Sequence, residues 1–266
     1  MPRHATLLPA LALTLIACHD EAKPTVLPPP ASTASAVTAN DPPPAPPVAQ
    51  VAVVIAEREI AFQGTKIMDL PSDRTAGADP KDKRSGKNDL YLVPLATACA
   101  SDGGRAVKSI VVDVDDTTPY RLVIEVLFTL GQCGFEHWDL RRRGHAEVVP
   151  ITPPRVHGAQ VAAPPSLALT VFLIDGGVSI KTRGGNVAPG CNDVGAGLAI
   201  PTRDGAQDPV ALGACARKLK ALFPNEQAVT FTASPGLPFG GAWAVIDAVR
   251  GAKGELFPDV MLGVSR

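Results

Sequence analysis

Two stretches of the chain decide its fold: SIVVDVDDTTPYRLVIEVLFTLG at residues 109–131 and AVTFTASPGLPFGGAWAVIDAVRG at residues 228–251. Each begins with a run of apolar and β-branched residues, the composition of a buried strand. Each then reaches a proline followed by an aromatic residue, and Pro119 and Pro238 lie 119 positions apart. The two stretches therefore predict the same unit of strand, turn and helix twice, as an internal repeat.

After each proline the apolar residues change to helical spacing. The residues that share one helical face are Val123, Leu127 and Leu130 in the first copy and Ala242, Ile246 and Val249 in the second. Gly131 and Gly251 suit the left-handed residue that often ends a helix. We therefore expect each helix to end at its glycine.

Upstream of each repeated strand, the pattern predicts a pair of hairpin strands. The first pair is expected at 51–55 and 59–62, and the second at 167–173 and 178–181. In the second pair Asp175-Gly-Gly177 supplies a tight turn. Both copies therefore begin with two strands.

Another helix is expected between each hairpin and the following strand. In the second copy Asp208 can cap the helix while Pro209 fills its first position. The apolar stripe of this helix consists of Leu212, Cys215, Leu219 and Leu222. In the first copy the equivalent is residues 90–100, where Pro94 would disrupt a helix interior.

Last strands at 136–140 and 258–264 complete a β-β-α-β-α-β order in each copy. The sequence thus predicts an α+β fold of two tandem domains, each with its helices on one sheet face, after a disordered Pro-rich tether. The expected boundaries are a signal peptide at 1–17, the tether at 18–50, domains at 51–145 and 167–266, and a linker at 146–166.

The first residues indicate export. A basic start precedes an apolar run at residues 5–17, which is shorter than the roughly 20 residues that a membrane helix needs. Cys18 follows a small residue, which resembles the lipobox of bacterial lipoproteins, so we expect Cys18 to carry lipid that holds the chain to a membrane. The alternative is an ordinary secretory peptide in which Cys18 is incidental. His19 after the cysteine favours the outer membrane by the same resemblance, and residues 18–50 are Pro- and Ala-rich, typical of a tether.

Charge and cysteines narrow the class of protein further. The formal net charge is −1, from 25 basic and 26 acidic residues, which argues against a nucleic-acid partner. Apart from Cys18 the chain has four cysteines, an even number that suggests two disulfides in an exported protein. The C-terminal ends of the two helices in each copy should lie side by side, which predicts a disulfide between Cys99 and Cys133. Cys191, in the loop that leads into a helix, can reach Cys215 on that helix, which predicts the second disulfide. The alternative is four reduced thiols.

No catalytic motif is found at its required spacing, and neither a metal nor a cofactor is expected. Asp113, Asp115 and Asp116 could begin a calcium loop, but Thr118 and Ile124 stand where such a loop needs Gly and Glu. The spacing of His137, His145 and His157 matches no zinc site. The run Arg141 to Arg143 could touch anionic headgroups or peptidoglycan, or form a solvated edge. Trp138 could bind a ligand, and Trp243 falls in a core stripe.

The passage from Asp113 to Gly131 resembles the periplasmic domains of the ExbD/TolR biopolymer-transport family. The positions that carry the resemblance are Asp115, Pro119 and Tyr120 in the first copy and Pro238 and Phe239 in the second. The second copy departs from the pattern, with Ser234 in place of Asp115 and Phe239 in place of Tyr120. The resemblance implies that the two domains pair with each other as an intrachain pseudo-dimer.

Members of that family carry a membrane helix with a proton-coupling aspartate. Residues 5–17 contain no aspartate, so this role does not transfer. The expected function is therefore a non-enzymatic, periplasmic lipoprotein that serves as an accessory or adapter in envelope transport or energy-coupling assemblies and binds protein or peptidoglycan. The alternatives are an envelope hydrolase and a structural lipoprotein without a dedicated partner.

Overall fold

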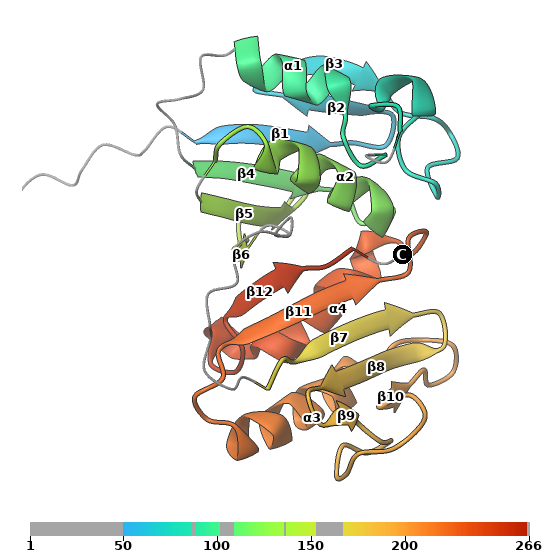
Figure 1. Cartoon of the computed structure of the whole chain (residues 1–266), viewed down its shortest axis with the longest axis vertical. Coiled ribbons are helices and arrows are strands. Elements are labelled where there is room, and N and C mark those ends of the chain that lie inside the picture. Colours follow the sequence, from blue (N-terminus) through green and yellow to red (C-terminus); the bar gives the residue numbers. More distant parts are fainter. Residues whose placement is uncertain (1–49, 87–88, 102–108, 136, 153–166, 265–266) are drawn as a thin grey trace, which may run out of the picture. The chain divides into compact units, whose positions relative to one another are not determined.

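The computed structural model describes residues 50–86, 89–101, 109–135, 137–152 and 167–264. In this part of the chain the fold is mixed α+β, with four α-helices and a sheet of twelve strands (Figure 1). The predicted signal peptide, Cys18 and the Pro-rich tether lie outside the described residues.

The first half of this fold contains six strands and two helices. Its elements are β1 (Val51–Ile55), β2 (Glu59–Phe62), β3 (Thr65–Asp69), a short 3-10 turn η1 (Pro80–Asp82), α1 (Val93–Ser101), β4 (Ser109–Val114), α2 (Tyr120–Gly131), β5 (His137–Arg142) and β6 (Val148–Thr152). The predicted hairpin, third strand and second helix agree with β1, β2, β4 and α2. Pro94 falls in the first turn of α1, where a proline is tolerated, so the helix starts later than predicted.

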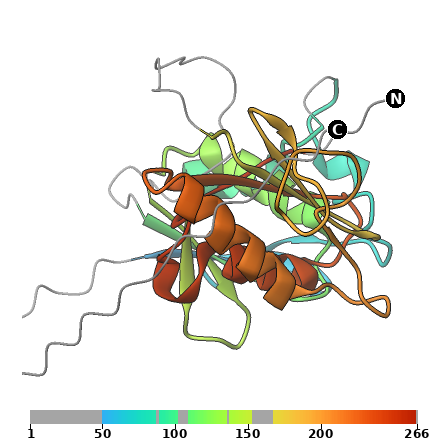
Figure 2. The same cartoon turned by 90° about the horizontal axis from the view of Figure 1, so that it is seen from below.

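The second half repeats most of these elements. They are β7 (Thr170–Ile174), β8 (Gly177–Thr182), β9 (Gly185–Asn186), β10 (Ile200–Pro201), α3 (Pro209–Leu222), β11 (Ala228–Ala233), α4 (Phe239–Arg250), η2 (Ala252–Gly254) and β12 (Asp259–Leu262). The bounds of β7, β11 and α4 are those of β1, β4 and α2 shifted by 119 positions. Figure 2 shows the structure from below, with this half nearest the viewer.

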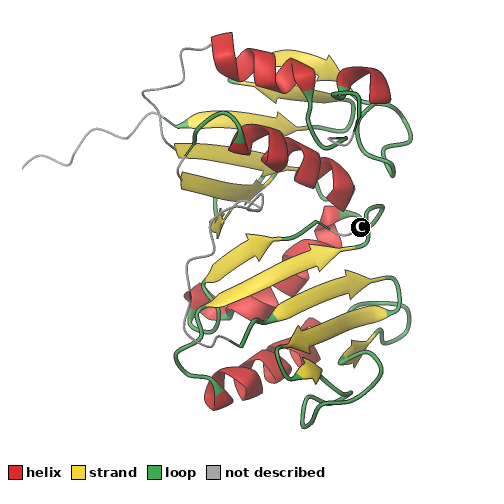
Figure 3. Ribbon diagram, in the orientation of Figure 1, coloured by secondary structure: helices red, strands yellow, loops and turns green. Residues whose placement is uncertain are grey.

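The strands run in the order β10-β8-β7-β11-β12-β6-β5-β4-β1-β2-β3, with β9 paired to β8 (Figure 3). The order reads alike on both sides of β6, with β12, β11, β7 and β8 on one side and β5, β4, β1 and β2 on the other. β6 pairs antiparallel with β5 and parallel with β12, so it joins the halves into one sheet. In each half the central strands are parallel, which their helical crossovers require.

Strand β6 lies inside the range predicted as a linker. Its side chains alternate, with Val149 and Ile151 buried and Val148 and Pro150 exposed. This alternation is typical of a half-buried strand, but the proline argues against a strand in sequence-based reasoning. Pairing with strands far away in sequence explains why a Pro-containing segment is a strand here.

The helices of each half pack on each other and on the strands. In β1, Val51, Val53 and Ile55 are buried while Ala52 and Val54 are partly exposed, so the helices cover one side of this strand. The buried side of α2 and its counterpart on α4 belong to the same apolar core. Trp243 is part of that core, as its place in the helix stripe predicted.

Candidate functional site

The helices α2 and α4 begin in the same unusual way. Pro119 and Pro238 are their N-cap residues, both in extended conformation, and neither helix start has a side-chain cap. The first N–H groups of a helix have no partner within the helix and need one elsewhere. Helix starts of this kind require acceptors from another part of the chain.

The acceptors come from the other half of the fold. Four backbone hydrogen bonds join the two helix starts, and we call this contact the junction. Tyr120 N donates to Leu237 O at 2.8 Å, and Phe239 N donates to Thr118 O at 2.7 Å. Arg121 N donates to Pro235 O at 2.9 Å, and Gly240 N donates to Asp116 O at 2.8 Å. A shift of 119 positions turns the first bond into the second and the third into the fourth. Each helix is thus capped by the turn that precedes the other helix, a reciprocal contact of the kind found in two-fold symmetric dimers.

Aromatic rings fill the space behind these bonds. The ring of Tyr120 stacks on Phe239 and meets Phe231 edge-on, with centroids 6.1 and 5.7 Å away. Phe239 in turn contacts Trp243 edge-on. The Tyr120 hydroxyl lies 2.7 Å from Gly263 O and 3.1 Å from Phe231 O, and burial raises its pKa. The predicted motif positions Pro119, Tyr120, Pro238 and Phe239 are therefore brought together where the two helices begin, with Pro119, Tyr120 and Phe239 buried and Pro238 exposed.

Asp115, the remaining motif position, shapes the first turn. Its carboxylate accepts hydrogen bonds from Thr117 N at 3.0 Å and Thr117 Oγ1 at 2.8 Å, which lower its pKa. Its carbonyl accepts from Thr118 N, and the Ser234 carbonyl accepts in the same way from Leu237 N. The change from Asp115 to Ser234 between the copies therefore leaves the backbone turn intact.

The acidic cluster and the arginine run, considered separately in the sequence, pair with each other. Their register follows from the parallel pairing of β4 with β5, which sets Asp113 opposite Arg141. The pairs are Arg141 with Asp113, Arg142 with Asp116, and Arg143 with Asp115. The carboxylates are thus occupied by guanidinium groups, which favours a structural role for both motifs.

A buried carboxylate that sequence reasoning missed lies on α2. Glu125 is fully buried and accepts from Lys83 Nζ at 2.7 Å, Arg121 Nε at 2.8 Å and Ala78 N at 2.8 Å. Arg121 also pairs with Asp89 at 2.6 Å. The segment between β3 and α1 is thereby fixed to α2. The available signal was a lone Glu within the apolar run of this helix.

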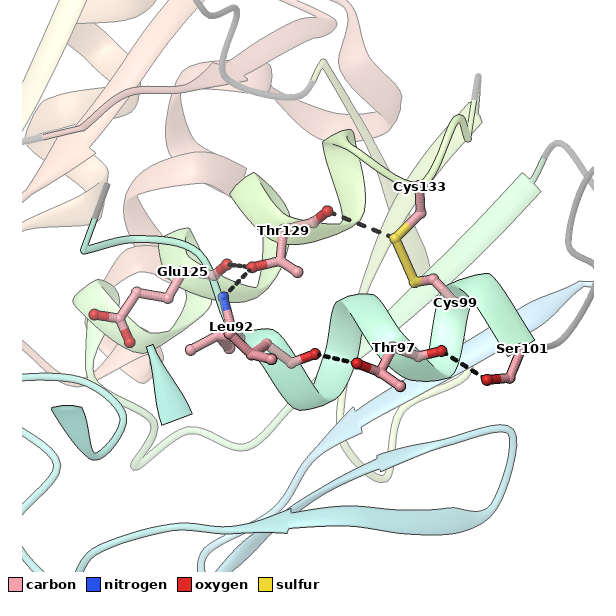
Figure 4. Close-up of a disulfide and its surroundings, with 8 residues drawn as sticks. Leu92, Thr97, Cys99, Ser101, Glu125, Thr129 and Cys133 are labelled. Atoms are coloured by element: carbon pink, nitrogen blue, oxygen red, sulfur yellow. Dashed lines mark hydrogen bonds between the residues drawn. A yellow bond between two sulfur atoms is a disulfide. The ribbon is translucent and has the colours of Figure 1, made fainter. Parts of the chain in front are cut away.

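Two disulfides join the cysteine pairs expected from the topology. Cys99 on α1 pairs with Cys133 after α2, with Cα atoms 6.0 Å apart, and Cys191 pairs with Cys215 on α3 at 5.5 Å. Figure 4 shows that Leu92, just before α1, donates to Thr129 on α2, at 2.8 Å. The helix α1 is therefore attached to α2 at both ends, by a hydrogen bond and by a disulfide.

The remaining candidate residues from the sequence, the histidines and Trp138, do not come together in one site. His137 and His145 are exposed, and His157 lies outside the described residues. Trp138 is buried, and its ring NH donates to Phe135 O. Within the described ranges no group of three or more His, Cys, Asp or Glu side chains could hold a metal ion. Over the same ranges no helix is long and apolar enough to cross a membrane.

In comparisons with known proteins, no family model, curated protein or solved structure matches the chain. The class defined by its own geometry is a mixed α+β protein whose two similar halves cap each other's helices.

Proposed function

We propose that the chain is an exported lipoprotein, anchored to a membrane through lipid on Cys18, that acts as a non-enzymatic adapter in envelope transport or energy-coupling assemblies. Its two halves are tandem ExbD/TolR-like domains of β-β-α-β-α-β order, held on the Pro-rich tether of residues 18–50. Its partners are envelope transport-complex proteins or peptidoglycan, and the outer membrane is the favoured location.

The reciprocal capping of α2 and α4 is the observation that carries this proposal. Domains of the ExbD/TolR type pair with each other, and a two-fold pair makes every contact twice. The bonds Tyr120 N to Leu237 O and Phe239 N to Thr118 O are such a repeated contact. Two domains in one chain would form this pair without a second molecule, which leaves their outer surfaces available to partners.

Two further observations support export and an adapter role. Disulfides are typical of oxidising compartments, and the chain has two. The motif residues are used for structure, because Tyr120 is buried in the junction and Asp115 fixes a turn. Both features favour a binding protein whose motif holds the fold together.

Fractionation tests the anchor. Cells that express the full chain and the Cys18→Ser variant are grown with a clickable fatty acid and separated into soluble and membrane fractions. We expect the unchanged chain to be labelled and retained with membranes, and the variant to be unlabelled and released. Equal retention and labelling of both would contradict lipidation of Cys18.

A second assay separates the adapter from a structural lipoprotein. The purified full chain is mixed with solubilised envelope complexes and, separately, with peptidoglycan sacculi. Reproducible capture of transport-complex subunits, or co-sedimentation with sacculi, is expected. If neither capture nor co-sedimentation is observed, the structural lipoprotein becomes the better description.

A further inference from the structure

The second half carries an apolar groove of about 540 Å³ between the loop after β9 and the end of α3. Its buried lining comes from Leu167, Val187, Cys191 and Leu219. Its rim is made of exposed apolar side chains: Val194 is 55% exposed, Leu222 71% and Phe223 43%. Exposed apolar residues gathered around a concave surface indicate an interaction site, and the volume is within the range of ligand pockets.

The loop side of this groove is fixed in place. The disulfide from Cys191 to Cys215 ties the loop to α3. Lys218 Nζ, also on α3, donates to Gly190 O at 3.0 Å and to Asn192 Oδ1 at 2.7 Å. A groove whose walls are fixed before binding loses little conformational entropy when a ligand enters.

The opposite side is fixed as well. Leu167 N donates to Glu226 Oε2 at 2.7 Å, and Phe223 N donates to Leu219 O at 2.9 Å, which closes the end of α3. The groove therefore lies between two anchored segments. In the first half the corresponding strand β3 has five residues and packs on α1, whereas β9 has two residues, so the two halves differ at this place.

The charges on the rim indicate what the groove can hold. Arg183 and Asp193 both line it, and within the described residues neither side chain forms an ion pair. The carboxylate of Asp193 accepts a hydrogen bond from the N–H of the next residue. A fatty acid would be attracted by Arg183 and repelled by Asp193. A peptide with one acidic and one basic residue beside an apolar core complements both charges.

We propose that this groove binds an extended protein segment with a short apolar core flanked by an acidic and a basic residue. The inference rests on the proposed adapter function and assigns it a surface and a kind of partner. Buried apolar contacts to Leu222 and Phe223 supply the affinity, and the rim charges fix the direction of the segment.

A peptide library tests this inference with the full, disulfide-bonded chain. Phage that display random 12-residue peptides are selected on the immobilised protein, and the enriched peptides are synthesised for fluorescence anisotropy. We expect enrichment of apolar cores flanked by opposite charges. Leu222→Glu should weaken binding at least tenfold, because it places a charge in the apolar rim. The matched control is Val210→Glu, at the other end of α3, where an apolar side chain is 78% exposed; it should leave binding unchanged.

Reversal of the rim charges tests the direction of the segment. The double variant Arg183→Glu, Asp193→Arg should prefer peptides whose flanking charges are exchanged. The groove is ruled out as the site if no peptide is enriched, or if Leu222→Glu and Val210→Glu affect binding equally. Binding of laurate without any peptide would mean that it is a lipid site instead.

The result is separable from the proposed function. If no peptide binds at the groove while lipidation and envelope capture are observed, only this inference is removed. If the groove binds peptide but Cys18 carries no lipid in cells, the proposed anchor is contradicted and this inference stands.

Discussion

The rings of Tyr120 and Phe239 stack with their planes at 7° to each other, although the two residues are 119 positions apart in the sequence. Each is the first residue of its helix, and each donates its backbone N–H to the turn before the other helix. Stacking and capping therefore occur at the same place. This contact accounts for the Pro-aromatic pair in both copies, because the proline is the N-cap residue of the helix and the ring packs at the junction.

Close packing at the junction predicts an unequal response of two neighbouring glycines in α4. A Cβ on Gly240 would lie 3.2 Å from the backbone oxygen and the Cβ of Asp116 in the other half. A Cβ on Gly241 would lie 3.8 Å from Leu173, an ordinary contact. Gly241→Ala should raise the free energy of unfolding by up to about 1 kcal/mol, the usual gain in a helix. Gly240→Ala should be less stable than Gly241→Ala by about 1–2 kcal/mol, because it crowds the junction.

Denaturant unfolding with both variants provides the measurement. Equal stability of the two alanine variants would show that Gly240 does not face a packed surface, and it would argue against the junction.

The buried Glu125 should be one of the most sensitive polar positions. Glu125→Gln keeps the shape but removes the charge that faces Lys83 and Arg121, which leaves the largely shielded Lys83 without its carboxylate partner while Arg121 keeps Asp89. We expect a loss of about 3 kcal/mol in the free energy of unfolding. The control is Asp89→Asn, at the exposed end of the same network, where the loss should stay below about 1 kcal/mol. Similar losses for the two variants would contradict the central place of Glu125.

Asp247 on α4 should oppose folding at neutral pH. Partial desolvation and the nearby Glu147 raise the pKa of its carboxyl, whereas Arg250 and Arg142 act in the opposite direction. An acid whose pKa is raised in the folded state destabilises the protein when it is ionised. The penalty is fully present above the raised pKa, and it is lost as the pH falls below the ordinary value of 3.8.

Asp247→Asn should therefore increase the melting temperature at pH 7, and the increase should disappear in acid. Thermal unfolding from pH 3 to pH 8 checks both parts. A variant that is less stable than the unchanged chain at pH 7 would refute the assignment, and Glu147→Gln should produce a smaller change in the same direction.

The elements that could be predicted from the sequence are those whose signals lie within a few neighbouring residues. The apolar run Val51 to Ile55, the capping Asp208 with Pro209, and the apolar stripe of α2 each arise within a few residues, so the strands and helices they predict are present. The disulfide pairs also followed from the order of elements, because neighbouring helices bring Cys99 close to Cys133.

Features that depend on contacts between distant segments could not be predicted in this way. β6 is a strand because β5 and β12 lie on either side of it, and its own Pro150 argues against a strand. Two of the partners of Glu125, Ala78 and Lys83, come from a loop more than forty residues earlier in the chain. The apolar groove likewise combines Leu167 ahead of β7, the end of β8, the loop after β9 and the end of α3, which no local pattern connects.

The central claim is that the two halves of the chain pair through Tyr120 and Phe239, and a double-mutant cycle tests it most directly. Tyr120→Leu, Phe239→Leu and the double variant are unfolded in denaturant alongside the unchanged chain. The account predicts a coupling of about 0.5–1.5 kcal/mol between the two rings, as for other aromatic pairs. A control cycle of Tyr91→Leu with Phe239→Leu should be additive. Additive effects of the Tyr120 and Phe239 substitutions, equal to those of the control cycle, would contradict the pairing of the halves.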